Sequence, residues 1–363
     1  MWRISEADLE AIAIGAGILG TGGGGNPYLG KIRMREHLRA GRTATVIPPQ
    51  AMPDDACVVS VFNMGAPTVG YERLPQGEED LRALRAVEAY LGRRVDAMVP
   101  GEIGGSNSVA PLVVSAQSGI PVIDGDGMGR AFPEIQMDTF AINGISPTPF
   151  ALCSHKGETE ILLGITDPRQ VERIARAWAV AHGARAATAG FVMTGAELKR
   201  YVIPHTMTLA REVGLAVQTA RAQHSDVTGA VLTVTGGRRL LTGKIIDVER
   251  RTTAGFAKGS VQVASEDGSY GRIAFQNENL IAWRFADASC NDGTLLAVVP
   301  DLICVVNSET GEPVTTELLR YGLRVTVVGI PAPPQLQTAR ALEFVGPQAF
   351  GYDVPYRPLE PIV

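Results

Sequence analysis

The chain has 363 residues, of which 45% are apolar and 20% are charged, a balance typical of a globular protein that buries a large core. Its formal net charge is -5 and its 33 lysines and arginines are scattered, which argues against a nucleic-acid surface or a polybasic membrane patch. No apolar run reaches the roughly 18 residues of a membrane span, the first residues do not resemble a signal peptide, and the four cysteines form no C-x-x-C pair. We expect a cytoplasmic protein of about two domains that contacts neither membrane nor nucleic acid.

The first part of the chain, residues 1–225, alternates helical and strand-like patterns. Ser5 followed by Asp8 predicts the cap of a first helix, and Asn26-Pro27 predicts the start of a second helix that runs to about Arg39. The alternation that follows indicates an α/β domain with a largely parallel sheet. Strands are predicted at 44–47, 57–62, 95–99 and 121–124, and further helices at 78–91, 107–118, 167–182 and 206–222.

From about residue 226 the pattern changes to short β-rich runs separated by glycine turns. The runs are GAVLTVTG, GKIIDVERRT, GSVQVAS, GRIAFQNENLIAWRF, GTLLAVVPDLICVVN and RYGLRVTVVGIPAPP. This rhythm predicts a second, smaller all-β domain over 226–337, barrel- or sandwich-like. Three prolines at 331, 333 and 334 end it, and we expect residues 338–363 to complete the α/β domain.

Gly15, Gly17 and Gly20 fit the G-x-G-x-x-G spacing of a dinucleotide-binding turn. In that motif a strand leads into the first glycine and a helix begins at the last, whereas here a capped helix leads in. The following strand also ends on prolines instead of the acidic residue that holds a ribose. We therefore expect no nucleotide cofactor, and interpret these glycines as a site of close helix packing.

Four consecutive glycines follow, at Gly22, Gly23, Gly24 and Gly25, and lead directly into Asn26. Such a run is entropically costly to order, so its presence needs a reason. One hypothesis is an anion nest, in which successive N–H groups ahead of a helix bind a carboxylate or phosphate. The alternative is a flexible loop.

The loop PGEIGGSNSVAPL, residues 100–112, follows the predicted strand 95–99. Ligands of open α/β sheets bind at the carboxyl ends of strands, where this loop begins. Glu102 is a candidate general base. Asn107 either binds a carbonyl or caps the next helix, and capping is the commoner role of such a residue.

The loop after the next strand, PVIDGDGMGRAFPEIQMD at 121–138, holds Asp124, Asp126, Arg130 and Glu134 among three glycines. Crowded carboxylates raise one another's pKa, which makes one of them a general acid or base. A second possibility is that they bind a divalent metal through oxygen. The third is a surface loop with turn-forming aspartates and an ion-paired Arg130.

Cys153 lies two residues before His155, so the two side chains share a face of a strand and a thiol–imidazole pair is conceivable. A structural buried cysteine is the preferred interpretation. The five histidines show no zinc-binding spacing.

The motifs ILGTGGGGNP, PGEIGGSN, DGDGMGRAFPE and PDLICVVNSETGEPVTTELLRYGLRVTVVGIPAPP together resemble the S-methyl thiohydantoin desulfurase family over nearly the whole chain. The resemblance implies an α/β domain, a distinct β domain, and a hydrolase. Its reaction is attack of water at C2 of an S-methylthio-hydantoin ring, which releases methanethiol and leaves a hydantoin. From chemistry and motif position, the candidates for proton transfer are Glu102, Asp124, Asp126 and Glu134, whereas Asn107 and Arg130 are candidates for holding the ring.

The expected partner is a small heterocyclic substrate that bears a carboxylate, for which the nest at 22–25 is a candidate site, and a homo-oligomer is a possible state. Two alternatives stay open at this point. One is a metal-assisted amidohydrolase of hydantoin-like rings that uses the same carboxylates with a divalent ion. The other is a non-catalytic subunit of a hydantoinase-type assembly.

Overall fold

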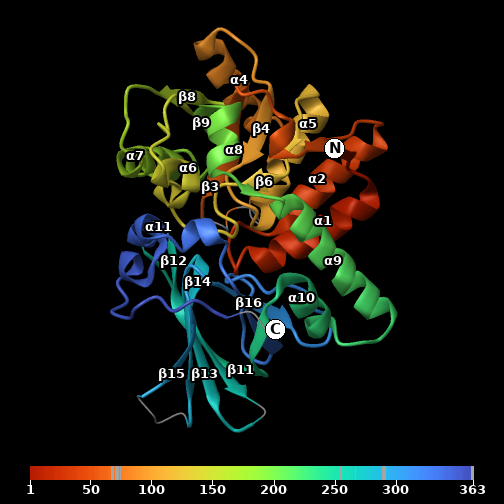
Figure 1. Cartoon of the computed structure of the whole chain (residues 1–363), viewed down its shortest axis with the longest axis vertical. Helices are drawn as coiled ribbons and strands as arrows, with labels where there is room; N and C mark the ends of the chain where they lie inside the picture. Colours follow the sequence, from red (N-terminus) through yellow and green to blue (C-terminus); the bar gives the residue numbers. More distant parts are fainter. Residues whose placement is uncertain are drawn as a thin grey trace.

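In a computed structural model of the chain, the described residues are 1–360 except 67–68, 70–72, 74, 254–255, 266 and 288–291. They form an eight-stranded sheet with helices around it, a separate seven-stranded sheet and a two-stranded ribbon of β6 (Gly125–Asp126) and β10 (Ile203–Pro204). Figure 1 shows the seven-stranded sheet below the α/β body, with α9 and α10 beside it. Within the described ranges, no helix is long and apolar enough to span a membrane.

The eight-stranded sheet has the order β1-β2-β5-β4-β3-β9-β7-β8. The four strands β2, β5, β4 and β3 run parallel, whereas β1, β9, β7 and β8 are antiparallel to their neighbours. The prediction of a largely parallel sheet is therefore wrong for β1 and for the three strands that residues 150–194 supply. The strands are β1 (Trp2–Arg3), β2 (Thr45–Ile47), β3 (Cys57–Gly65), β4 (Ala97–Pro100), β5 (Val122–Ile123), β7 (Phe150–Cys153), β8 (Thr159–Leu162) and β9 (Arg185–Thr194).

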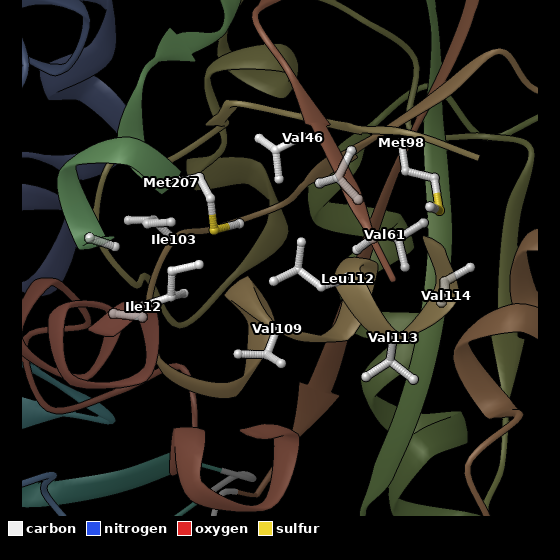
Figure 2. Close-up of a cluster of buried hydrophobic side chains, with 14 of the residues drawn as sticks. Ile12, Val46, Val61, Met98, Ile103, Val109, Leu112, Val113, Val114 and Met207 are labelled. Atoms are coloured by element: carbon white, nitrogen blue, oxygen red, sulfur yellow. The ribbon is translucent and has the colours of Figure 1, made fainter. Parts of the chain in front are cut away.

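Helices cover both faces of this sheet. One face packs against α1 (Glu6–Leu19), α2 (Pro27–Arg39), α4 (Glu79–Leu91), α5 (Ala110–Ser118) and α9 (Thr206–Ala222). The other face packs against α7 (Pro168–Ala181) and α8 (Gly195–Tyr201). Figure 2 shows the first core, where Leu112 of α5 and Met207 of α9 gather with Val61 and Met98 of the strands. The sheet is thus the middle of three layers. Because helices cover both faces, the loops that could bind a ligand lie at the ends of the strands.

Local capping signals predicted the helices well. The Ser5 and Asp8 side chains form a reciprocal capping box at the start of α1, as predicted. Asn26 caps α2 by accepting a 2.8 Å hydrogen bond from the Tyr28 amide, and Pro27 is its first residue. These two predictions are confirmed.

The seven-stranded sheet is antiparallel throughout, in the order β15-β14-β13-β12-β11-β17-β16. It curls into a half-barrel, so that Asn279 of β14 donates a 2.9 Å hydrogen bond to the Ile303 carbonyl of β16. The sandwich alternative is wrong, because the described residues of this region form one curled sheet. The strands are β11 (Arg238–Thr253), β12 (Phe256–Ser265), β13 (Tyr270–Gln276), β14 (Glu278–Phe285), β15 (Thr294–Val298), β16 (Leu302–Asn307) and β17 (Arg324–Ile330).

The first predicted β run, GAVLTVTG, is instead part of the helix α10 (Val227–Thr235). Asp226 caps it by accepting a hydrogen bond from the Thr228 amide, and Val227 and Val231 are buried at i, i+4 spacing. A capping aspartate and tertiary burial therefore override the β propensity of its valines and threonines.

A further apolar cluster joins the two sheets to the end of the chain. It contains Met128 and Phe132 of the loop after β6, Leu280 of β14, and Val345 of α11 (Ala339–Val345). α11 also contacts α6 (Thr139–Ile142) of the α/β body. The acidic loop 124–138 is consequently held between both sheets.

The glycines of the G-x-G-x-x-G spacing lie in α1 and near its end, where α1 crosses α9. A Cβ on Gly15 would stand 1.8 Å from the Ala210 carbonyl oxygen, and a Cβ on Gly214 would stand 1.8 Å from that of Ala11. The two backbones therefore touch through reciprocal glycines, and close helix packing is confirmed for Gly15. Gly17 instead packs against the Pro313 side chain, and Gly20 against the backbone of Gly23 and Gly105.

Gly214→Ala tests this contact. Alanine favours a helix by about 1 kcal/mol over glycine, but the clash with a backbone carbonyl cannot be relieved by a side-chain rotation. We expect a net loss of about 1–3 kcal/mol, seen as a lower midpoint of urea unfolding. The exposed Glu212→Ala on the same helix is the control and should leave the midpoint nearly unchanged. A stabilised Gly214→Ala protein would contradict the packing argument.

Candidate active site

A cavity of about 110 Å³ opens at the carboxyl end of β3 and β4. This is where ligands bind in open α/β sheets. Its wall comes from the α/β body and, through the start of β14, from the half-barrel. The lining includes Gly24–Asn26, residues 62–66, Gly101, Glu102, Ser106, Asn107, Met128, residues 132–135, Asp138, Glu172, Arg176, Arg185, Asn277 and Glu278.

Glu102, a predicted site residue, lines this cavity and is only 6% exposed. Its carboxyl accepts hydrogen bonds from the Asn107 amide group at 2.6 Å and from the Phe132 backbone N–H at 3.2 Å. Burial raises the pKa of Glu102 to about 8, although both donors oppose that shift. A carboxyl with such a pKa exchanges its proton near neutral pH, as a general acid or base must.

Asn107 fixes the position of Glu102. Its side chain accepts from the Asn63 backbone N–H at 2.8 Å and donates to the Asn63 carbonyl at 3.0 Å, in addition to its bond with Glu102. The capping alternative is wrong, because α5 begins at Ala110 and has no side-chain cap. Asn107 instead ties the loop 100–109 to the end of β3.

Glu278, the first residue of β14, is a buried cavity residue that the sequence pattern missed. It is 3% exposed, and its Oε2 has no hydrogen-bond partner among the described residues. Burial, with the nearby charge of Glu102, raises the pKa of Glu278 well above its usual range. One signal was present in the sequence. Glu278 is a charged residue inside the β-rich run GRIAFQNENLIAWRF, and the strand pattern does not account for a charge there.

The glycine run lies against both loops of the site. Gly24, Gly25 and Asn26 line the cavity, whereas Gly22 and Gly23 do not. A Cβ on Gly23 would stand 1.9 Å from the Glu278 carboxyl, and Gly24, at φ +72°, leaves no room for a Cβ beside the Gly104 carbonyl. Close approach therefore accounts for these glycines, and the anion nest stays a prediction.

The predicted acidic cluster is divided between different environments. Asp124 accepts hydrogen bonds from the Thr208 amide and hydroxyl, at 2.9 and 2.6 Å, and so binds the first turn of α9. Asp126 accepts three backbone N–H bonds, from Ile103, Met128 and Gly129, and burial raises its pKa to about 7. Neither lines the cavity.

Arg130 and Glu134 also separate. Arg130 is fully buried outside the cavity lining, with its guanidinium bonded to backbone carbonyls and to the Thr21 hydroxyl. Glu134 lines the cavity and accepts a hydrogen bond from the Gln136 side chain. Of the four carboxylates predicted for proton transfer, the structure therefore brings Glu102 and Glu134 to the cavity.

Cys153 is fully buried, and burial raises the pKa of its thiol, as expected for the structural cysteine that we preferred. His155 directs its Nδ1 toward Arg73 and the His182 carbonyl instead of the thiol. In the part of the chain that the structure describes, no three histidine, cysteine or acidic side chains are grouped so that they could hold a metal ion.

The fold and the cavity together define a two-sheet α/β protein whose buried acidic pocket is assembled from both sheets. Two family profiles match the chain: "S-Me-THD-like, N-terminal domain" over residues 7–163 and "S-Me-THD-like, C-terminal domain" over residues 166–359. The chain belongs to this S-methyl thiohydantoin desulfurase-like family, whose name implies an enzyme. The two profiles meet between residues 163 and 166, and our predicted boundary at 225–226 stays a prediction.

A solved structure shares the fold. The crystal structure of a protein from Chromobacterium violaceum, a structural genomics target, superposes with a TM-score of 0.81 at 24% sequence identity. The match covers 99% of this chain and 100% of that chain. Comparison with curated proteins gives no match. At this identity the crystal structure supports the fold alone.

The raised pKa of Glu102 makes stability depend on pH. Between its unfolded value of 4.5 and about 8, the native protein keeps a proton that the unfolded chain has lost. The free energy of unfolding therefore falls as pH rises through this range, by up to about 1.4 kcal/mol per pH unit for each such group. Glu102→Gln should make the slope shallower between pH 5.5 and 7.5 in denaturant titrations. The exposed Glu160→Gln should keep the original slope, and equal slopes for Glu102→Gln and the parent would contradict the assignment.

Proposed function

We propose that the protein is a hydrolase that attacks C2 of an S-methyl thiohydantoin ring and releases methanethiol and a hydantoin. The observation that carries the proposal is the pair of buried carboxyls, Glu102 and Glu278, on the wall of one cavity. Membership of the family supports the substrate class. The cavity volume of about 110 Å³ suits a small ring.

The two carboxyls have different surroundings, which assigns them different roles. Glu102 accepts two hydrogen bonds, and such donors favour the ionised form. Glu278 has a free Oε2 and is raised further by the charge on Glu102, so a proton shared by the pair resides on Glu278. Glu102 then acts as the base that activates water, and Glu278 acts as the acid.

The proton balance of the reaction fits one base and one acid. Glu278 protonates the ring nitrogen as the water oxygen bonds to C2, while Glu102 takes a proton from that water. The C2–S bond then breaks, the hydroxyl becomes the C2 carbonyl, and methanethiol leaves with a proton from Glu102. Transfer of the remaining hydroxyl proton to Glu278 restores the pair. Water supplies both protons, one for nitrogen and one for sulfur.

Asp126 and Arg130 hold the loops from which these groups project, and Asp124 fixes α9 beside them. We therefore propose positioning roles for all three. Glu134, which lines the cavity, remains a candidate for proton transfer.

A thiol-release assay on S-methylated and unmethylated thiohydantoins tests the function. We expect methanethiol from the S-methylated ring, and a fall in kcat of about 10²- to 10⁴-fold in Glu102→Gln and in Glu278→Gln. The exposed Glu160→Gln is the matched control and should keep full activity. Ring opening of plain hydantoins with no thiol from any substrate would contradict the proposal.

The pH dependence separates the base from the acid. Because Glu102 must be ionised, kcat/KM should rise with pH, and the midpoint of this rise should lie at about pH 8. At higher pH kcat/KM should fall again as Glu278 loses its proton. The Asn107 hydrogen bond lowers the pKa of Glu102, so Asn107→Ala should move the rising limb to higher pH. A lower maximum with an unmoved limb would show that Asn107 does not act through Glu102.

A further inference from the structure

Arg185, the first residue of β9, lines the cavity of Glu102 and also a smaller neighbouring cavity of about 30 Å³. Arg185 is partly buried; burial lowers the pKa of Arg185, whereas the charges of Asp80 and Glu79 raise it. Its one side-chain hydrogen bond to the described residues runs from Nη2 to the Asn63 side-chain oxygen at 3.3 Å. Among the described residues, no carboxylate comes within 4.0 Å of its nitrogens. Several of its N–H groups are thus left for a ligand.

The other arginine of the cavity, Arg176, is already neutralised. Its Nε lies 2.5 Å from the Glu172 carboxylate, its Nη2 donates to the Pro133 carbonyl at 2.9 Å, and its guanidinium stacks over Phe256. The contrast matters because the two carboxylates whose charges act on Arg185, Asp80 and Glu79, lie beyond 4.0 Å from its nitrogens, which leaves a direct ion pair to a ligand. The protein satisfies one cavity arginine internally and leaves Arg185 without an ion pair.

Hydrogen bonds connect Arg185 to the carboxyl pair. The side chain of Asn63 accepts a hydrogen bond from Arg185, and the backbone of Asn63 bonds to the Asn107 side chain. Asn107 in turn donates a hydrogen bond to Glu102. A ligand group held by Arg185 therefore has a fixed relation to the proposed base. The guanidinium fork matches the two oxygens of a carboxylate, which gives orientation as well as charge neutralisation.

We propose that Arg185 binds a carboxylate on the substrate's side chain and thereby places the ring between Glu102 and Glu278. This inference rests on the proposed function and assigns the specificity of the same site. Arg185 would form an ion pair with the carboxylate. The glycine nest at 22–25 would offer it backbone N–H groups alone.

The test compares two S-methyl thiohydantoins, one with a carboxyalkyl group at C5 and one with the corresponding neutral amide. In Arg185→Gln, KM for the acid should rise about 10- to 100-fold with little change in kcat, as expected for a lost charged hydrogen-bond pair. KM for the amide should stay nearly constant. Arg173→Gln, which removes an exposed positive charge from α7, is the matched control and should change neither KM.

Equal losses for acid and amide, or an unchanged KM for the acid, would overturn the assignment and favour the glycine nest. If Arg185→Gln fails to fold, Arg185→Lys keeps the charge without the fork, and a selective rise in KM for the acid is still expected. If the parent protein turns over neither ring, the proposed function fails, and calorimetry with the carboxyalkyl hydantoin tests Arg185 separately. Binding that Arg185→Gln abolishes supports the carboxylate site, and equal binding by both proteins contradicts it.

Discussion

The buried guanidinium of Arg130 is the interaction on which the site's architecture depends. Its nitrogens reach the Thr21 hydroxyl and the Asn279 carbonyl, both at 2.9 Å, and the Asp301 carbonyl at 2.8 Å. One side chain therefore ties the acidic loop to the glycine turn, to β14, and to the connection before β16. Burial lowers its pKa to about 10, so it stays charged at neutral pH, and fixed carbonyl dipoles replace the water it has lost.

This anchor links the two sheets from which the proposed catalytic pair comes. Glu102 belongs to the loop after β4 of the α/β body, and Glu278 begins β14 of the half-barrel. The charge of Arg130 lowers the pKa of both carboxyls and partly offsets the desolvation that raises them. The same residue thus links the two halves by hydrogen bonds and lowers the pKa of the carboxyls between them.

The sequence predicted those features whose causes are local. The bounds of α2 and α9 follow from an Asn-Pro start and from apolar spacing, and Glu102 follows from its place after a strand. The antiparallel strands β7, β8 and β9 were missed because their place in the sheet depends on pairing between distant residues, as between β3 and β9. Glu278 and Arg185 were missed for the same reason, since each becomes part of the site through contacts with residues far away in the chain.

Proximity in the sequence also misled. Asp124, Asp126, Arg130 and Glu134 stand within eleven residues, yet β6 and the turn after it send them in different directions. The Oδ2 of Asp126 accepts hydrogen bonds from three backbone N–H groups of the loops. The lone pairs of that oxygen are therefore occupied and do not serve as a base toward a substrate. The useful distinction is therefore whether each buried carboxyl lines the cavity. Asp126 and Glu278 each have one carboxylate oxygen without a hydrogen-bond partner among the described residues, but of Asp126, Glu102 and Glu278 only the last two line the cavity. Contact with the cavity separates the residue that builds the loop from those that we propose to exchange a proton with a ligand.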